Sequence, residues 1–489
     1  MAPDPASATP STEPPTSLPG ADPAPGGEPV LGASSPTAKG TPQGAPAKGA
    51  PQDSGPVAGL VRRTMRLSIV EGGLMQVFLN WTTGSVLVGY LLALGATPLH
   101  IGLVGSVPLL SQLASPFGAW AAEVLGQRRL VATLLGVIGR LSWLLAVFLP
   151  QLGVPAALQP SVIVVLVLFA SAFQSATGTI WTAWMGDVVP DDRRGRYFGM
   201  RTGVLGVVGM AANLAAGAFL DRGAAPLSFQ VVLGVAILSS LAAAVLYLFH
   251  YDPPTEKHPG RFGHVVLTPL KHPNFRRFLI FAALWQFAVM LGATFVIPYF
   301  LEELGMSFTQ VAVWSSAAAI TALATTIVWG RVADRVGNKA VVAIGTFLAG
   351  FLLPSNWILA GLTGRLEFIW FSAVCEAVAW GAIGPAVFNL ALVTSPRSGR
   401  VTYIALYSVA SGAAGFVGGA LSGPLLQWFT SIDWPGAWSG YHTLFALTGV
   451  GRMLGWVWLR PVKEERAWRT RDVVSSLAIP ARRRRTFGR

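Results

Sequence analysis

Three ionisable side chains lie inside long apolar segments, where a charged group is not expected without a specific role. Glu376 lies about ten residues into one segment, Arg140 is similarly deep in another, and Glu71 is near the start of the first. A charge held far from water is costly, so each of these residues is expected to have a function or a partner. Because burial favours the neutral form of a carboxyl group, Glu376 can load and release a proton. We predict these three residues as the proton-coupling candidates.

Two interpretations of Glu376 remain open because Arg140 carries the opposite charge. An ion pair between the two would hold Glu376 ionised and give both residues a structural role. Without that pair, Glu376 is free to carry a proton. Arg201 and Arg452 lie nearer the ends of their segments. Their long side chains are expected to extend to the membrane surface.

A second group of charges occurs in short motifs that separate apolar segments. The stretch GRVADRVGNK at 330–339 has a relative, AAEVLGQRR, at 121–129. RRGRYFGMR at 193–201 similarly resembles RSGRVTYIA at 397–405. Both pairs are separated by about 200 residues. Two pairs of motifs at a similar spacing predict two halves of the same topology in parallel orientation.

The composition is that of a polytopic membrane protein. Of the 489 residues, 52% are hydrophobic and only 12% are charged. Apolar runs of this length can cross a bilayer as helices, which satisfy their own backbone hydrogen bonds. We predict an all-α fold with twelve transmembrane helices. Their ranges are 67–92, 98–122, 129–150, 161–186, 197–220, 226–249, 277–301, 306–330, 339–362, 367–394, 401–428 and 438–459.

Lys and Arg residues are concentrated in the even-numbered loops and at both ends of the chain. The positive-inside rule then places both termini in the cytoplasm, with the chain in the cell (inner) membrane. The net charge of +13 therefore reflects topology, and no nucleic acid is expected as a partner. We predict five parts: a disordered tail rich in Pro, Ala and Gly at 1–60, helix bundles at 61–249 and 276–460, a central loop at 250–275, and a basic tail at 461–489.

The motifs resemble those of the major facilitator superfamily (MFS). GRVADRVGNK departs from the superfamily signature between helices 8 and 9 at Val332 and Asn338. It matches that signature at Gly330, Ala333, Asp334, Arg335, Gly337 and Lys339. The copy between helices 2 and 3 is weaker, and DVVPDDRRGR at 187–196 resembles the element between helices 4 and 5. This resemblance, which covers residues 60–460, implies the MFS fold.

The resemblance also implies a cytoplasmic gate, in which acidic side chains bond to arginines or to exposed N–H groups at helix starts. Such bonds would hold the cytoplasmic helix ends together when the protein opens outward. The alternative is that these charges only fix the topology. The predicted gate residues are Glu123, Arg128, Asp187, Arg194, Gly330, Asp334, Arg335, Gly337, Lys339 and Arg397.

In this superfamily, helices 1, 4, 7 and 10 line a central cavity. Amide and indole side chains on those helices suit a substrate with both polar groups and an apolar face. The alternative for each residue is a hydrogen bond between helices or an aromatic side chain at the membrane surface. The predicted cavity residues are Gln76, Asn80, Trp81, Gln174, Trp181, Trp285, Gln286, Trp380 and Asn389. Glycines four residues apart, at Gly415, Gly419 and Gly423, would allow close helix packing.

The leading functional prediction is a monomeric secondary transporter that moves a small molecule by alternating access, with proton-coupled efflux of a drug-like or metabolic compound. Uptake of sugars or other nutrients and a non-transporting membrane sensor or scaffold are the alternatives. No enzyme is expected, because the sequence shows no nucleophile–base pair and no phosphate-binding loop. We predict neither a cofactor nor a metal, since the one cysteine, Cys375, cannot form a site alone.

Overall fold

The computed structural model describes residues 56–253, 268–396 and 400–464. Most of the predicted N-terminal tail, much of the central loop and nearly all of the C-terminal tail lie outside these residues, as does Arg397. Within them, every regular element is a helix. The predicted all-α fold is confirmed.

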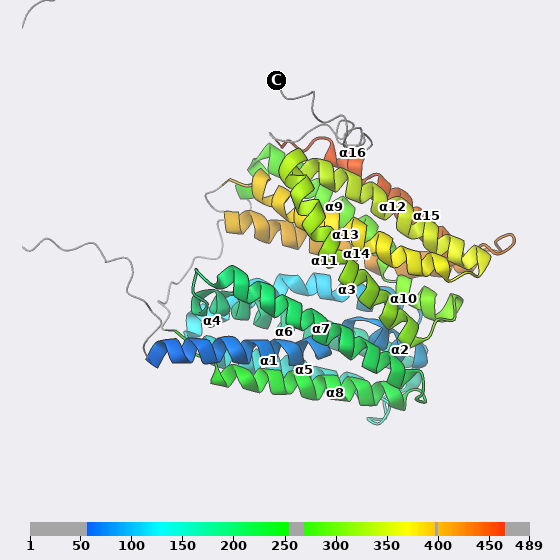
Figure 1. Cartoon of the computed structure of the whole chain (residues 1–489). Coiled ribbons are helices and arrows are strands. Elements are labelled where there is room, and N and C mark those ends of the chain that lie inside the picture. Colours follow the sequence, from blue (N-terminus) through cyan, green and yellow to red (C-terminus); the bar gives the residue numbers. More distant parts are fainter. Residues whose placement is uncertain (1–55, 254–267, 397–399, 465–489) are drawn as a thin grey trace, which may run out of the picture. The chain divides into compact units, whose positions relative to one another are not determined.

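The first half of the described chain forms a bundle of helices (Figure 1). Its α-helices are α1 (Pro56–Thr83), α2 (Ser85–Ala93), α3 (Pro98–Leu110), α4 (Ser115–Leu125), α5 (Arg128–Val147), α6 (Gln159–Val188), α7 (Arg194–Leu220) and α8 (Leu227–Leu246). Short 3-10 turns add η1 (Ser111–Ala114), η2 (Ala156–Leu158) and η3 (Tyr247–Phe249).

The second half forms a bundle of the same kind. Its helices are η4 (Thr268–Lys271), α9 (Pro273–Ala293), α10 (Val296–Pro298), the π-helical turn η5 (Tyr299–Glu303), α11 (Phe308–Val336), α12 (Asn338–Thr363), α13 (Glu367–Thr394), α14 (Arg400–Thr430), α15 (Gly440–Met453) and α16 (Gly455–Leu459). Ten helices of the described chain are long and apolar enough to cross a membrane. The predicted segments at 67–92 and 438–459 are each divided, between α1 and α2 and between α15 and α16.

Equivalent turns in the two halves contain glycines with positive φ angles, a conformation that side chains with a Cβ rarely adopt. Gly95 has φ +75° and Gly305 has φ +61°. Gly126 and Gly337, which end α4 and α11, have φ +62° and +90°. These pairs recur at the spacing of the sequence motifs. The structure therefore repeats the same turn geometry in both halves.

The segment after each bundle also returns to the start of that bundle's third crossing helix. The Asp252 carboxylate accepts a bond of 3.4 Å from the Arg129 backbone N–H at the start of α5. Glu464 accepts bonds from the backbone N–H groups of Asn338 and Lys339 at the start of α12, at 3.1 and 2.7 Å. A carboxylate stabilises a helix N-terminus through its exposed N–H groups and the helix dipole. In each half, the segment after the last helix is thus held to the third crossing helix by an equivalent carboxylate contact.

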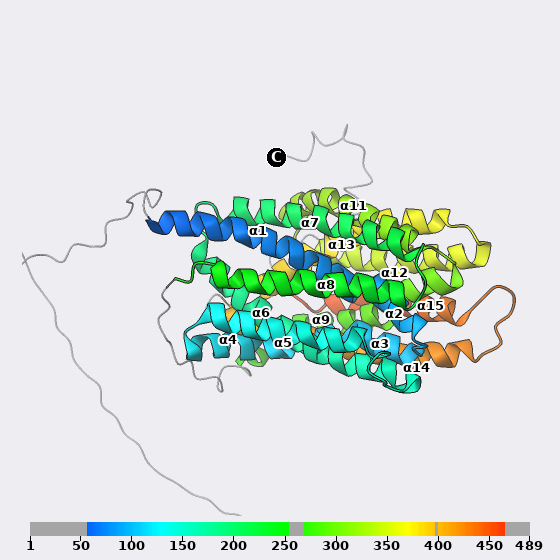
Figure 2. The same cartoon turned by 90° about the horizontal axis from the view of Figure 1, so that it is seen from below.

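The ends of the bundles differ in charge. We call the end with the turns at Gly126, Val189–Arg193 and Gly337 the basic end, and the other the opposite end. The two halves contact each other towards the opposite end, where α7 packs against α11 and α3 packs against α14 (Figures 1 and 2).

At the opposite end, Asp221 follows directly after α7 and accepts two hydrogen bonds from the other half. Its carboxylate oxygens lie 2.7 Å from the Phe308 backbone nitrogen and 3.0 Å from that of Thr309, at the start of α11. The Phe308 ring also packs against Phe229, with 5.5 Å between ring centroids. Among the described residues, the hydrogen bonds between the halves all end on the Asp221 carboxylate.

Candidate functional site

A cavity of about 1210 Å³ lies between the two halves. The first half contributes most of its wall, from α1, α2, α3, η1, α4, α5 and α6. The second half adds residues of α9, α10 and the start of α14. The space is large enough for a drug-sized molecule.

The cavity wall is apolar with a band of hydroxyl and amide groups. Phe78 and Trp143 supply aromatic surface, with their rings edge-to-face at 5.9 Å between centroids. Gln112 and Gln174 are the amide side chains among the lining residues, all of which are described. The same lining contains no Asp, Glu, Lys, Arg or His side chain.

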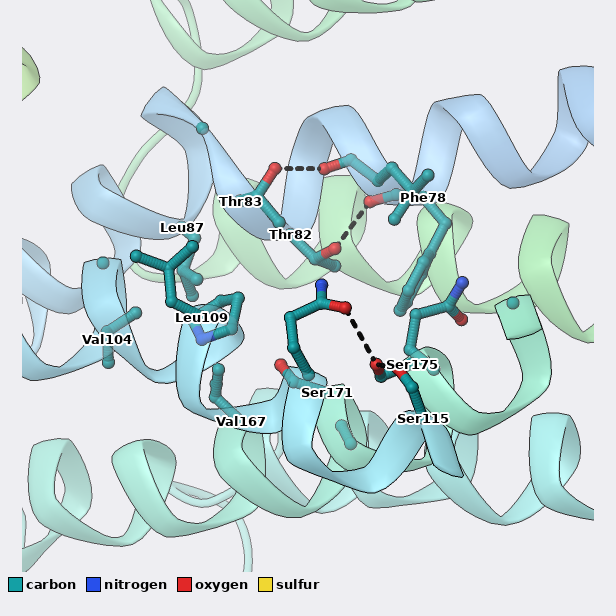
Figure 3. A pocket seen from close by; sticks show the side chains of 18 of the residues that line it. Phe78, Thr82, Thr83, Leu87, Val104, Leu109, Ser115, Val167, Ser171 and Ser175 are labelled. Carbon is teal, nitrogen blue, oxygen red and sulfur yellow. Dashed lines mark hydrogen bonds between the residues drawn. The ribbon is translucent and has the colours of Figure 1, made fainter. Parts of the chain in front are cut away.

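The hydroxyl groups gather where α6 faces η1 and α4 (Figure 3). The Ser115 and Ser175 hydroxyl oxygens are 2.7 Å apart, and Ser175 donates to the Gln112 side-chain oxygen at 3.4 Å. Thr82 and Thr83 face them from α1 and donate to backbone carbonyls of their own helix. The polar band thus crosses from one helix of the first half to its neighbours.

Of the nine predicted cavity residues, Gln174 lines this cavity. Asn80 instead accepts a bond of 2.9 Å from the Asn213 amide, and the Trp81 indole donates to the Ala212 carbonyl at 3.1 Å. Both bonds join α1 to α7. Their polar groups are used to hold helices together, which was the alternative reading of these side chains.

The other predicted cavity residues lie elsewhere in the helix packing. Trp285 packs against Trp380, with 6.2 Å between ring centroids. Trp181 lies under the Arg201 guanidinium, whose carbon is 4.2 Å from the ring centroid. The side chain of Gln76 approaches Gly209, that of Gln286 approaches Gly415, and Asn389 is exposed.

Sequence reasoning missed the contributions of the second, third and eleventh crossing segments, of which the third supplies Trp143. Gln112 and Ser115 come from the predicted segment at 98–122, and Ser408 comes from that at 401–428. A polar side chain within an apolar run is the sequence signal that marks such residues. The prediction considered that signal only in helices 1, 4, 7 and 10, which the family resemblance places around the cavity.

Glu71 belongs to a buried cluster in the first half. Tyr247 donates its hydroxyl to one carboxylate oxygen of Glu71 at 3.1 Å. Arg201 forms an ion pair with the other oxygen at 3.5 Å, and Arg140 interacts with the same carboxylate electrostatically. Arg140 is 2% exposed, and its Nε and Nη1 have no hydrogen-bond partner among the described residues. One carboxylate thus compensates two arginines, of which Arg140 is buried and Arg201 is largely so, with 14% of its side chain exposed.

Glu376 belongs to a separate pair in the second half. It interacts electrostatically with Arg452, and its Oε2 atom is buried without a hydrogen-bond partner in the described chain. Arg452 is 1% exposed and donates to the Val289 carbonyl at 3.1 Å. The structure therefore assigns Arg140 to Glu71 and Arg452 to Glu376. The expectation that Arg201 and Arg452 extend to the membrane surface is wrong. Arg201 donates to the Ser68 carbonyl and pairs with Glu71, and Arg452 donates to the Val289 carbonyl inside the second half.

We expect Glu71→Ala to lower the free energy of unfolding by about 3–5 kcal/mol, because it leaves two arginines buried without their counter-charge. Thermal unfolding of the purified protein in detergent measures this loss. Glu367→Ala is the matched control, since Glu367 is exposed and its contact with Arg365, at 3.6 Å, is on the surface. Its expected effect is within about 0.5 kcal/mol. Equal losses in the two variants would contradict the assignment.

Several predicted gate residues form contacts within the first half. Arg128 and Asp187 form an ion pair of 2.6 Å between α5 and α6. Arg194 pairs with Asp191 at 2.7 Å and donates to the Gly186 carbonyl at 2.7 Å. The Arg194 bonds fix the turn between α6 and α7, and the Arg128–Asp187 pair holds α5 against the end of α6. The side chain of Glu123 lies outside the described part.

The second-half motif has a different arrangement. Asp334 and Arg335 are exposed near the end of α11, and neither forms an ion pair within the described chain. Gly330 has open space around it, and Gly337 directly precedes α12 as its N-cap. The Lys339 ammonium donates to the Arg460 and Val462 carbonyls at 2.9 and 2.5 Å. In this structure, Asp334 is thus free of the bonds expected of a closed gate.

Comparison with known proteins now identifies the family. The model of the Major Facilitator Superfamily matches residues 72–418 and also 282–487. The inward-open xylose transporter XylE from E. coli is 16% identical, with a TM-score of 0.61 over 85% of this chain and 99% of that one. The nucleoside transporter NupG is 14% identical, with a TM-score of 0.63 over 82% of this chain and 100% of that one.

A bacterial homologue of the human lysosomal transporter Spinster, inward-facing and occupied, is 17% identical, with a TM-score of 0.63 over 83% of this chain and 98% of that one. No curated protein sequence gives a significant match. At these identities the structural likeness shows the fold, and the family model confirms the predicted resemblance. The chain therefore belongs to the Major Facilitator Superfamily and is a multi-pass membrane protein with that family's transporter fold.

Proposed function

We propose that the chain is a secondary active transporter that moves a small solute by alternating access and exports a drug-like or metabolic compound in exchange for protons. It acts as a monomer in the cell (inner) membrane, with both termini in the cytoplasm. The family model supports transport, and the distribution of Lys and Arg supports the orientation.

The observation that carries this proposal is the position of the cavity relative to the contacts between the halves. Asp221 and the contacts of α3 with α14 join the halves at the opposite end. At the other end of α14, Ile404, Ala405 and Ser408 line the cavity. A cavity closed on one side by contacts that can separate is what alternating access requires. The basic end is then the open, cytoplasmic side.

In this proposal, the motif around Asp334 closes the basic end when the transporter opens outward. Asp334 is exposed and free to accept bonds from a helix start in that second state. The halves would then exchange one carboxylate contact for another. Asp221 bonds to the start of α11 in the state described here, and Asp334 bonds at the basic end in the other state.

Glu376 is the proposed proton carrier. Glu71 compensates two arginines, so its protonation would leave both buried charges without a partner. Glu376 interacts with one arginine and accepts no hydrogen bond in the described chain, whereas Glu71 also accepts the Tyr247 hydroxyl. A proton on Glu376 therefore disturbs fewer contacts, and we propose a structural role for Glu71.

The cavity lining favours export of an amphipathic compound over sugar uptake. A sugar presents hydroxyl groups in all directions and needs several amide or charged partners to replace its bound water. The described lining offers two amides among many apolar side chains. An aromatic corner of Phe78 and Trp143 instead suits an apolar ring.

Proton movement in proteoliposomes that contain a pH dye tests the proposal, with sugars, amino acids and drug-like compounds as added solutes. We expect a solute-driven pH change that Glu376→Gln abolishes. The exposed control variant Glu367→Gln is expected to retain it. A signal that survives in Glu376→Gln would remove Glu376 from the coupling role. If no solute drives a pH change or enters the vesicles as a radiolabel, the scaffold alternative is supported instead.

A further inference from the structure

The polar groups of the cavity differ in whether their hydrogen-bonding capacity is already used. The Thr82, Thr83, Thr179 and Thr182 hydroxyls donate to carbonyls of their own helices. The Thr294 hydroxyl is paired with Ser422 at 3.0 Å. These hydroxyl groups make the wall polar without leaving a donor free for a ligand.

A second group retains unused donors and acceptors. Ser171 and Gln174 on α6, and Ser408 on α14, make no side-chain hydrogen bond to the described residues. The Gln112 side chain accepts from Ser175 through its oxygen, which leaves its NH₂ group free. Three of these four side chains, Gln112, Ser171 and Gln174, lie on neighbouring turns of α6 and η1 and form one strip on the wall of the first half. The fourth, Ser408, lies apart from them on the second half.

The wall that the second half contributes is mainly apolar. It consists of Met290, Ala293, Ile297, Ile404 and Ala405, with the hydroxyls of Thr294, which is paired with Ser422, and Ser408. The buried or largely buried ionisable side chains Glu71, Arg140, Arg201, Glu376 and Arg452 are all outside the lining. An ion that entered the cavity would lose its water and find no opposite charge among the described lining residues, which costs several kcal/mol or more.

From this arrangement we infer that the cavity binds an uncharged, amphipathic solute. Its carbonyl, amide or hydroxyl groups face Gln112, Ser171 and Gln174, and its apolar face lies against α9 and α14. This inference rests on the proposed function and names the substrate class of the same site. Ser171 and Gln174 are the specificity-determining side chains, because they orient the polar edge of the solute.

The test uses the full chain in lipid nanodiscs and four groups of small molecules matched in mass. The groups are uncharged amphipathic compounds, uncharged polyols, organic cations and organic anions. A ligand that binds only the folded state raises the unfolding temperature, by an amount that grows with the ratio of its concentration to its Kd. We expect the stabilising compounds to come from the first group. Three results would overturn the inference: stabilisation mainly by the organic cations or the organic anions, equal stabilisation by all four classes of compound, or stabilisation by none of them.

Variants of the polar strip supply the second readout. We expect Ser171→Ala and Gln174→Leu each to weaken binding of the stabilising compounds about three- to tenfold, the loss for one uncharged hydrogen bond. Gln427→Leu is the matched control, since Gln427 is exposed on α14 outside the cavity. Ser171→Asp should admit cationic analogues that the unmodified cavity rejects. Unchanged affinity in all three cavity variants would remove the strip from substrate recognition.

Failure of the inference and failure of the proposed function give different results. If charged compounds bind and drive the pH change in proteoliposomes, the transport proposal stands and the substrate class is wrong. If uncharged amphipathic compounds bind but neither drive a pH change nor cross the membrane, the cavity chemistry is right and the transport proposal fails.

Discussion

Replacing Asp221 with Ala is expected to shift the conformational equilibrium away from the state that is closed at the opposite end, by about five- to thirtyfold. Two charge-assisted bonds to the N–H groups of Phe308 and Thr309 are lost. Bonds of this kind at a partly exposed helix N-terminus contribute about 1–2 kcal/mol together. They exist only while α7 and α11 are in contact, so the whole loss falls on the closed state.

Spin labels on opposite halves measure this equilibrium without a known substrate. Leu152 and Asp433 are exposed in loops at the opposite end, one in each half. Cysteines at these two positions, in a Cys375→Ala background, report the separation of the halves. We expect the fraction of molecules with a long distance between the labels to be smallest with Asp221 intact, larger in Asp221→Asn and largest in Asp221→Ala. The Asn side chain is intermediate because its carbonyl oxygen still accepts one bond. Glu367→Ala, an acid of the same end with its partner in its own half, should leave the distances unchanged. Identical distributions in all variants would refute the role of Asp221.

The Asp221 contact should be insensitive to pH in the physiological range. Partial burial acts to raise the pKa of Asp221, but hydrogen bonds from Thr309 and Phe308 outweigh it and hold the pKa below the ordinary value of 3.8. A lowered carboxyl pKa contributes stability above the ordinary value, and that stability is lost only as the pH falls through the lowered value. Between about pH 5 and pH 8 the contact is therefore constant. A pH-dependent shift of the label distances in that range would point to another group, of which Glu376 is our candidate.

Sequence patterns predicted the fold because the membrane allows few solutions. A run of apolar residues must be a helix in lipid, and paired motifs at a fixed spacing indicate a repeat. Glycines at Gly126 and Gly337 could be placed at turns because the motifs containing them are flanked by apolar helices. These arguments depend on local composition, which the sequence displays directly.

The site was harder to predict because the same side chains serve packing and binding. Asn80 and Trp81 have the chemistry of a substrate site, yet both hold α1 against α7. Which face of a transmembrane helix turns to the cavity depends on contacts with distant helices, which a single sequence does not display. Asp221 was missed for a related reason. An acidic residue in a loop carries no periodic signal, and its partner, the start of α11, is far along the chain.

The α14 glycines are expected to control closure as strongly as Asp221. Gly419 packs against Ser106, and a Cβ on Gly423 would lie 2.5 Å from the Pro98 carbonyl oxygen and 2.6 Å from the Leu99 Cα. The obstructing atoms at Gly423 belong to the backbone of α3 and cannot rotate away. We therefore expect Gly423→Ala to prevent the close approach of α3 and α14, and Gly423→Leu to abolish the closed state altogether.

Whether Gly423→Ala weakens or strengthens closure distinguishes a steric clash with α3 from a change in helix propensity. Alanine favours a helix over glycine by up to about 1 kcal/mol, so propensity alone predicts a neutral or stabilising change. Gly384 on α13 has open space around it, and Gly384→Ala is the matched control. The Leu152 and Asp433 labels should report long distances in both Gly423 variants and unchanged distances in the control. If the Gly423 variants also kept the short distance, α3 and α14 would not form the surface on which the opposite end closes. Combining Asp221→Ala with Gly423→Ala should add little further opening, because each contact forms only when the same two halves meet.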